Sequence, residues 1–496
     1  MIHSADLVWW ETATLGLYLA VLGLLAIYGL HRWHLVALHR RHRGQPPQPP
    51  GRFAEPPLVT VQLPVYNERY VVDRLIAAVC SLDWPRDRLE IQVLDDSTDD
   101  TVAVAAEAVA RWRAEGFDIH HVRRADRHGY KAGALDHGLG LARGEFLLIF
   151  DADFVPRPEL LREMADHFTD PAVGLVQARW DHINREHSLL TQVQALMLDG
   201  HFVVEHAARH RSGRFFNFNG TAGLWRRGAI ETAGGWQHDT LTEDLDLSYR
   251  AQLAGWRFVY LADLTAPAEL PVEMDAFKGQ QHRWTKGSVQ TGLKLLPRLW
   301  RAPLPLRVKA EATFHLTDNF SYLLMIALAL LLGPVILIRA AHHLNWLYLV
   351  DLPLFFAGTL SVSAFYLWTL RETGGLTVRR VLLLPALMAL GIGLCLNNGR
   401  AVLEALRGKP SPFVRTPKHR IERRGQRWTH LRYRAARSWL PVLEVTFGVV
   451  WTGITALAIW HGQYLALPIL WLFPVGFLFV GTVSLGQRLG RSRTQA

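Results

Sequence analysis

Six uncharged apolar stretches constrain the fold of this chain more than any other feature of its sequence. They occupy residues 13–30, 321–338, 352–370, 381–398, 445–460 and 465–486. A helix needs about 20 predominantly apolar residues to cross the hydrocarbon core of a bilayer, and these stretches approach that length. One long polar stretch, residues 50–310, separates the first of them from the rest. The sequence therefore predicts an integral membrane protein, in contact with a lipid bilayer, with a single soluble insert.

The positions of the basic residues predict how the chain is oriented. The net charge of +10 would suit a nucleic-acid-binding protein, but the excess lies beside the apolar stretches, at 31–43, 371–380 and 400–437. Such an excess is typical of cytoplasmic loops, so we expect no nucleic-acid partner. The residues before the first stretch carry no Lys or Arg, which is the reverse of a signal peptide. We expect an uncleaved first span, an outer N-terminus and a cytoplasmic insert.

The same charges predict the number of membrane crossings. From a cytoplasmic insert, the span at 321–338 leads out and the span at 352–370 leads back. The loops on both sides of 381–398 are basic, so this stretch is expected to be interfacial or re-entrant. The organisation that follows has about five transmembrane helices plus interfacial helices. Residues 1–50 form a span and a basic, proline-rich linker, 51–310 the insert, and 311–496 a domain of four spans with an interfacial helix at 381–405 and a loop at 409–438.

The insert has the pattern of an α/β domain. Expected strands at 58–63, 90–94, 118–122, 145–150 and 173–178 alternate with helical segments, which predicts a largely parallel sheet. The second half is less regular, and its segment 189–205 fits a helix packed either on the membrane part or on the sheet. A basic segment from Gln280 to Trp300 predicts a helix at the membrane interface.

Acidic residues follow several of the expected strands. Asp151 and Asp153 come directly after the apolar run 145–150, at the edge where open α/β sheets bind their ligands. Such a pair can hold Mg²⁺ or Mn²⁺, although a surface turn is the more common explanation of an acidic pair taken alone. Asp244, in the triplet Thr242-Glu243-Asp244, can be explained as a helix cap. Arg123 and Arg124 are expected to be solvated, and Trp180 is either structural or a sugar platform.

The full set of polar groups suits transfer from a nucleotide-diphosphate donor. An aromatic ring can stack on a base, cations can offset charge on a leaving diphosphate, and a carboxylate can accept a proton from a hydroxyl. The chain has no phosphate-binding loop of the ATPase kind, and its two cysteines give no zinc-binding spacing. The groups concerned are the carboxylates Asp95, Asp96, Asp151, Asp153 and Asp244, the cations Lys131 and Arg283, and the aromatics Tyr66 and Trp284.

Eight segments carry a resemblance to the membrane-embedded family 2 glycosyltransferases, the group of cellulose, hyaluronan and mannan synthases. The likeness is greatest to the cellulose-synthase-like A (gluco)mannan synthases and their bacterial relatives. The segments are QLPVYNER at 62–69, QVLDDSTD at 92–99, GYKAGAL at 129–135, FDADF at 150–154, VQARW at 176–180, FNGTAG at 218–223, TED at 242–244 and QQHRW at 280–284.

The resemblance implies a GT-A fold, an inverting transfer of hexosyl units and a role for each matching residue. Asp244 would be the catalytic base, and Asp151 and Asp153 would hold Mg²⁺ or Mn²⁺. The donor nucleotide and diphosphate would be bound by Tyr66, Glu68, Asp95, Asp96, Lys131 and Arg283. The acceptor would be bound by Trp284, Gln280, Asn219 and Gly220.

A further likeness lies after the expected interfacial helix. FVRTPK at 413–418 resembles the gating loop of these synthases, with Arg415 in place of the usual valine. The likeness implies that Phe413, Arg415, Thr416 and Lys418 belong to a gate over the donor site.

We therefore expect a processive synthase of a β-linked polysaccharide of the mannan or glucan type. Its donor would be of the GDP-mannose, GDP-glucose or UDP-glucose type, its acceptor the growing polysaccharide, and its location a bacterial inner (plasma) membrane. One alternative is a non-processive enzyme that glycosylates a lipid such as ceramide. Another is a catalytically inactive membrane scaffold subunit.

Overall fold

The structure is a computed structural model that describes residues 7–411 and 413–493. A seven-stranded sheet forms the centre of the insert, with the strand order β3-β2-β1-β4-β6-β5-β7. Strand β6 runs antiparallel to both neighbours and all other pairs are parallel, so the expected parallel-rich mixed sheet is confirmed. The strands are β1 (Val59–Val65), β2 (Leu89–Asp95), β3 (Asp118–Val122), β4 (Phe146–Ile149), β5 (Val173–His182), β6 (Gly223–Arg226) and β7 (Arg257–Ala268).

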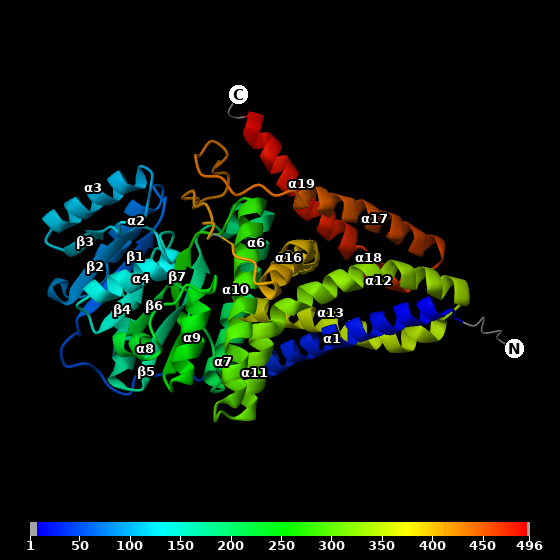
Figure 1. The fold of residues 1–496 in the computed structure, drawn as a ribbon, viewed down its shortest axis with the longest axis horizontal. Helices are drawn as coiled ribbons and strands as arrows, with labels where there is room; N and C mark the ends of the chain where they lie inside the picture. Colours follow the sequence, from blue (N-terminus) through cyan, green and yellow to red (C-terminus); the bar gives the residue numbers. More distant parts are fainter. Residues whose placement is uncertain (1–6, 412, 494–496) are drawn as a thin grey trace.

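Helices cover both faces of this sheet and make the insert a three-layer α/β/α domain (Figure 1). Strands β1 and β2 are buried along their whole length, as their unbroken apolar runs predict. One face packs against α2 (Val72–Cys80), α3 (Thr101–Ala114) and α5 (Leu160–Ala165). The other packs against α4 (Tyr130–Leu141), α8 (Arg227–Thr232) and α9 (Glu243–Leu253).

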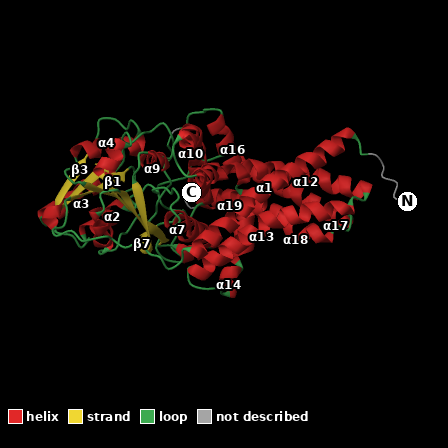
Figure 2. Cartoon of the chain, turned by 90° about the horizontal axis from the view of Figure 1, so that it is seen from below, coloured by secondary structure: helices red, strands yellow, loops and turns green. Residues whose placement is uncertain are grey.

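The membrane part is a bundle of long helices that extends away from the insert (Figures 1 and 2). Among the described residues, five helices are long and apolar enough to cross a membrane. Helix α1 lies beside α12 and α13 although they are distant in sequence. The spans are α1 (Trp9–Arg41), α11 (Leu306–Thr317) continued by α12 (Ser321–His342), α13 (Tyr348–Glu372), α17 (Leu440–Trp460), and α18 (Leu467–Leu470) continued by α19 (Leu472–Arg493).

A bent helical segment occupies the stretch that was expected not to cross. It consists of α14 (Val378–Val381), α15 (Leu383–Gly393) and α16 (Cys395–Leu406). The helical axis turns by 42° between α15 and α16, as in a broken span or a re-entrant segment. The loop that follows, in which residue 412 lies outside the described residues, runs back to the insert.

The segment 189–205 joins the insert to the membrane part. Helix α6 (Leu189–Asp199) continues as a π-helical turn, Gly200–His206, and then as α7 (Ala207–Arg211). Both packing alternatives are realised, because Leu190 and Val193 pack with membrane helices while Ala195 and Phe202 pack under the sheet.

The basic segment expected from Gln280 begins earlier, as part of α10 (Met274–Arg301). This helix packs against α9, α11 and α16, so it too connects the two parts. The insert is therefore attached to the membrane helices by packed elements as well as by the chain.

Candidate active site

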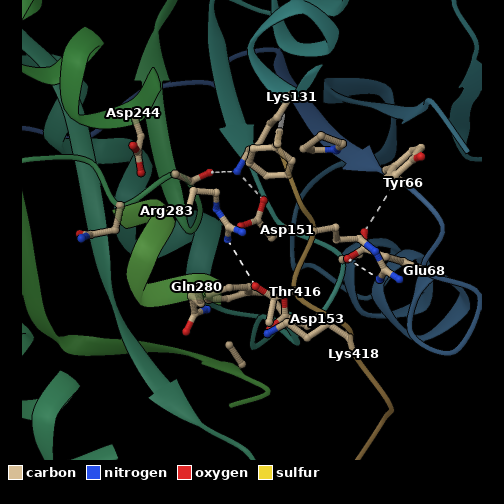
Figure 3. A pocket seen from close by; sticks show the side chains of 18 of the residues that line it. Tyr66, Glu68, Lys131, Asp151, Asp153, Asp244, Gln280, Arg283, Thr416 and Lys418 are labelled. Atoms are coloured by element: carbon tan, nitrogen blue, oxygen red, sulfur yellow. Dashed lines mark hydrogen bonds and ion pairs between the residues drawn. The ribbon is translucent and has the colours of Figure 1, made fainter. Parts of the chain in front are cut away.

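A cavity opens at the carboxyl ends of β1 and β4, where a parallel sheet presents its loops (Figure 3). All but one of the residues that the sequence assigned to a site contribute to its lining, although they come from distant parts of the chain. They are Tyr66, Glu68, Asp96, Lys131, Asp151, Asp153, Asn219, Gly220, Asp244, Gln280, Arg283, Trp284, Phe413, Arg415, Thr416 and Lys418.

The two carboxylates of the Asp-x-Asp pair each contact a lysine. The Lys131 ammonium donates to Asp151 Oδ1 at 2.5 Å, and the Lys418 ammonium donates to Asp153 Oδ2 at 2.6 Å. Asp153 is buried, whereas 35% of the Asp151 side chain is exposed. Two carboxylates one residue apart at the end of a strand are hard oxygen ligands, so this donor set fits a divalent cation such as Mg²⁺ or Mn²⁺.

Asp244 lies in the first turn of α9 and faces the cavity. Its Oδ1 accepts a hydrogen bond from the Leu245 N–H at 2.8 Å. Burial, and after it the neighbouring Glu243 carboxylate, raise the pKa of Asp244 to about 7, while Lys131 opposes the rise. A carboxylate with a pKa near neutrality can accept a proton from a hydroxyl and release it again, so the geometry allows general base chemistry in addition to helix capping.

Gly220 lets Asp244 and Lys131 approach each other. Its φ is +79°, a conformation that favours glycine. A Cβ atom there would lie 2.9 Å from Asp244 Oδ2 and 3.3 Å from Lys131 Nζ. The Gly220 carbonyl accepts a hydrogen bond from Lys131 Nζ at 2.8 Å, which helps to hold the lysine beside Asp151.

The side of the cavity beneath Tyr66 contains an arginine that sequence reasoning missed. The Arg127 guanidinium lies 3.3 Å from the centroid of the Tyr66 ring and also approaches Tyr130 and Phe413. Burial is the main cause of the lowered pKa of Arg127. The only sequence signal was its position two residues before the segment 129–135.

Asp96 and Asp95 have different surroundings although they are adjacent. Asp96 lines the cavity and pairs with both ends of the Arg124 guanidinium, at 3.0 and 2.5 Å. The expectation that Arg124 is solvated is therefore wrong. Asp95 is buried away from the cavity lining, where Ser97 N–H donates to it at 2.8 Å and His121 Nε2 lies at 2.9 Å.

Burial opposes ionisation of Asp95, but the hydrogen bonds with His121 and Ser97 outweigh it and lower the pKa. The structure thus separates Asp95 from the nucleotide-binding group to which the sequence assigned it. Its visible role is to hold the turn that presents Asp96.

The segment 413–418 closes one side of the cavity. The Arg283 guanidinium donates to the Val414 carbonyl at 2.6 Å and lies 4.7 Å from the centroid of Phe413. Arg415 lies 3.5 Å from Glu68 Oε1, and burial raises the pKa of Glu68 to about 7 although Arg415 opposes the rise. In this arrangement Arg283 faces the loop.

A second cavity begins on the far side of Asp244. Six residues line both cavities and form a common wall: Trp180, Leu198, Asn219, Thr242, Asp244 and Trp284. The Trp180 and Trp284 rings lie 6.4 Å apart, which places Trp180 beside the expected acceptor residue. The second cavity in turn shares residues with a third, which lies among the membrane helices.

Comparisons with known proteins agree with this arrangement. Residues 56–287 match the family model described as glycosyltransferase like family 2. Glucomannan 4-beta-mannosyltransferase 2 of Arabidopsis thaliana is 47% identical over 250 residues, which are 49% of this chain and 47% of that protein. Glucomannan 4-beta-mannosyltransferase 1 of Oryza sativa subsp. japonica is 46% identical over 271 residues, 53% of this chain and 51% of that protein. The alignment thus spans about half the length of these curated relatives.

A solved structure has a similar fold. A mannosyltransferase from Pyrobaculum calidifontis, determined in complex with GDP-Man and Mn²⁺, superposes with a TM-score of 0.51 at 20% sequence identity, over 81% of this chain and 99% of that chain. The mixed sheet, the cavity at its strand ends and the matching family model lead to one assignment. Residues 56–287, the larger part of the insert, match the glycosyltransferases of family 2, and membrane helices carry this GT-A-like domain.

Proposed function

We propose that this chain is a processive, inverting glycosyltransferase that builds a β-linked polysaccharide of the mannan or glucan type. One observation carries the proposal above the others. Asp244 stands in the wall between two cavities, one with the groups that suit a nucleotide-diphosphate donor and one with room for an acceptor. A base in that position can act on an acceptor hydroxyl while the donor lies on the other side.

The chemical step that fits this wall is a single displacement. The Asp244 carboxylate accepts the proton of the acceptor hydroxyl, and the acceptor oxygen forms a bond to C1 of the donor sugar. The bond from C1 to the diphosphate oxygen breaks, and its electron pair leaves with the nucleoside diphosphate. Attack opposite to the leaving group inverts the configuration at C1. Lys131 and Arg283 would stabilise the negative charge on the leaving group.

Asp151 and Asp153 would hold a divalent cation, Mg²⁺ or Mn²⁺. When bound there, the ion offsets the charge of the diphosphate. The Mn²⁺ and GDP-Man bound by the structural neighbour, and the mannosyltransferase names of the relatives, favour a metal-dependent enzyme with GDP-mannose as the donor. GDP-glucose and UDP-glucose are the next donors to test.

Processive elongation is supported by the series of cavities. The cavity behind Asp244 lies next to one bounded by α1, α12, α13, α15 and α19, and Arg32, Asp318 and Tyr322 border both. A growing chain that enters there would leave the site through the membrane part. The proposal places the insert on the cytoplasmic side. Because the similar curated proteins come from plants, they do not support the bacterial inner membrane that we expected.

Two alternatives make different predictions. A lipid glycosyltransferase would add one sugar to a lipid, and the third, largely apolar cavity could hold an acyl chain. An inactive scaffold subunit would need neither Asp244 nor the cations around it, yet the backbone conformation of Gly220 and its close approach to Asp244 and Lys131 favour a glycine there.

The proposal is tested with the purified chain in lipid nanodiscs and Mg²⁺ or Mn²⁺. Radiolabelled GDP-mannose, GDP-glucose, UDP-glucose and UDP-N-acetylglucosamine are supplied separately, with Asp244→Asn as the control. We expect a high-molecular-weight product from one donor, absent with the variant. Label found only in a lipid fraction would replace the proposal with the lipid glycosyltransferase, and equal label in both proteins would reject a catalytic Asp244.

A further inference from the structure

Beyond the segment 413–418, the loop between α16 and α17 encloses a hollow against the insert, here called the loop hollow. Its volume is about 440 Å³, and among the described residues its lining has no member in common with that of the candidate active site. The insert forms one wall with Arg69, Tyr70 and Val104, and loop residues between His419 and Leu431 form the other. A ligand that fills the loop hollow would therefore touch both the loop and the insert.

The loop hollow is lined by cations. Three of its ten described lining residues are arginines, Arg69, Arg420 and Arg427, and none of the ten is Asp or Glu. Arg69 pairs with Asp100, and Arg420 lies 3.6 Å from Glu422. Arg427 has no carboxylate within ion-pair distance in the part of the chain that the structure describes. Cations on the two walls repel each other, which opposes docking of the loop unless an anion lies between them.

The backbone of the loop has an uncommon conformation where it enters the loop hollow. The φ of Arg420 is +57°, which is rare for a residue with a side chain and costs on the order of 1 kcal/mol or more. The Glu269 carboxylate holds this turn, because it accepts hydrogen bonds from the N–H groups of His419 and Arg420, each at 2.9 Å. Such strain is concentrated at ligand-binding and switch segments, and here it places Arg420 in the wall of the loop hollow.

Contacts beside the loop hollow dock the loop on the insert. The Tyr433 hydroxyl donates to Asp99 at 2.7 Å, and the Arg74 guanidinium donates to Glu422 at 2.8 Å. Between these contacts the two walls stay apart, and the space between them is many times what one water molecule needs. The loop hollow therefore has room for a polyatomic anion.

We propose that the loop hollow binds a phosphate group and that the bound anion holds the loop against the insert. A guanidinium group presents paired N–H donors that match the oxygens of a phosphate, and a dianion offsets the repulsion between the two walls. A free phosphate-bearing metabolite and a phosphomonoester lipid headgroup offer the same chemistry, so the test has one arm for each. The inference does not depend on the proposed sugar transfer.

The test measures amide hydrogen exchange of residues 419–433 by mass spectrometry, with the full chain in phosphatidylcholine nanodiscs and no divalent metal. Inorganic phosphate is compared with sodium chloride at equal ionic strength, which removes general screening as a cause. We expect exchange to slow by roughly tenfold at about ten times the Kd of phosphate, because only the docked loop binds the anion. The lipid arm omits free phosphate and replaces part of the phosphatidylcholine by phosphatidic acid. Slowing in that arm alone would keep the site and identify a headgroup as its ligand.

Two substitutions locate the effect. Arg427→Gln removes the lining arginine that has no carboxylate partner in the described chain, and it should raise the Kd of the phosphate group roughly tenfold or more. Arg424→Gln is the matched control, because Arg424 is an exposed arginine of the same loop that does not line the loop hollow. It should leave the Kd within about twofold of that of the unchanged protein.

Two outcomes would overturn the proposal. One is exchange that neither phosphate nor phosphatidic acid slows in the unchanged protein. The other is slowing that Arg427→Gln leaves intact, since the anion would then bind elsewhere, as in the candidate active site beneath the loop. Absence of sugar transfer in every assay, together with slowing that depends on Arg427, would reject the proposed function and keep the phosphate site.

Discussion

At the scale of single residues, Asp244 has the clearest consequence for activity. Its pKa is raised to about 7 by burial and by Glu243, so at lower pH the group is protonated and cannot accept a proton. We expect kcat/KM to fall about tenfold per pH unit below about pH 7 and to level off above it. The measurement is initial rate against pH at low donor concentration, with the acceptor held constant.

Glu243→Gln tests whether the Glu243 charge contributes to the raised pKa of Asp244. Removing the neighbouring negative charge should move the acidic limb to lower pH, because the ionised form of Asp244 is then less disfavoured. A limb that stays in place in this variant would show that another group controls it.

Gly220 provides a second test at this scale. Gly220→Ala would force a methyl group against Asp244 Oδ2 in a backbone conformation that alanine disfavours. We expect the rate of sugar transfer to drop by at least tenfold. The free energy of unfolding should fall modestly, on the order of 1–2 kcal/mol. Gly228→Ala is the control, since its Cβ would meet nothing within 4 Å and it lies in helix α8.

Most residues of the candidate site could be located from the sequence. They lie in recognisable motifs, either directly after a strand or in the first turn of a helix. Sequence reasoning placed Asp95 with Asp96, although Asp95 is buried outside the cavity lining, because the sequence does not show which of two adjacent carboxylates turns inward at the strand end. It missed Arg127 because its contact with the Tyr66 ring exists only in the folded chain. The role of each site residue in binding or catalysis stays a prediction.

At the scale of elements, the loop between α16 and α17 is the part whose behaviour is easiest to test. Lys418 donates to Asp153 and to the Glu269 carbonyl, both at 2.6 Å, and is buried there. Lys418→Met would leave Asp153 buried without its cation, which is strongly unfavourable. We expect amide hydrogen exchange of residues 413–421 to become at least tenfold faster, as measured by mass spectrometry.

Lys409→Met is the control within the same loop, because this side chain is exposed. Unchanged exchange after loss of Lys418 would mean that other contacts hold the loop. The contacts of Arg283 with Val414 and of Arg415 with Glu68 would then be the next to remove.

Most elements of the first half of the insert could be predicted, since buried strands and amphipathic helices alternate there regularly. Strands β6 and β7 were not, because a short antiparallel strand such as β6 interrupts the βαβ order. The π-helical turn Gly200–His206 has no sequence signal of its own. It depends on tight packing, for a Cβ at Gly200 would come within 2.7 Å of Phe365 in α13.

At the scale of the whole molecule, the loop also bears on membrane topology. Residues that follow the bent segment contact the insert, as Lys418 does with Asp153 and Tyr433 with Asp99 at 2.7 Å. Segments in contact must lie on the same side of the membrane, which supports the proposal that 381–405 does not cross. Hydropathy alone allows this segment to be a sixth span. The distribution of basic residues along the whole chain predicted instead that it does not cross.

Cysteine labelling tests this topology, since both native cysteines are buried. With a membrane-impermeant maleimide applied to intact cells, Leu465→Cys in the exposed link before α18 should be labelled. Arg424→Cys in the loop should react only after the membrane is opened. Labelling of the loop position from outside would refute the five-span arrangement.

The loop between α16 and α17 and the Asp153 carboxylate that it covers belong to one chain. Closure of the loop over the cavity is therefore a unimolecular event. The loop is anchored at both ends, by α16 up to Leu406 and by α17 from Leu440. A tether of this kind gives the partners an effective concentration on the order of millimolar. Closure is therefore independent of enzyme concentration, and a free peptide with the loop sequence would need to approach millimolar concentration to replace it.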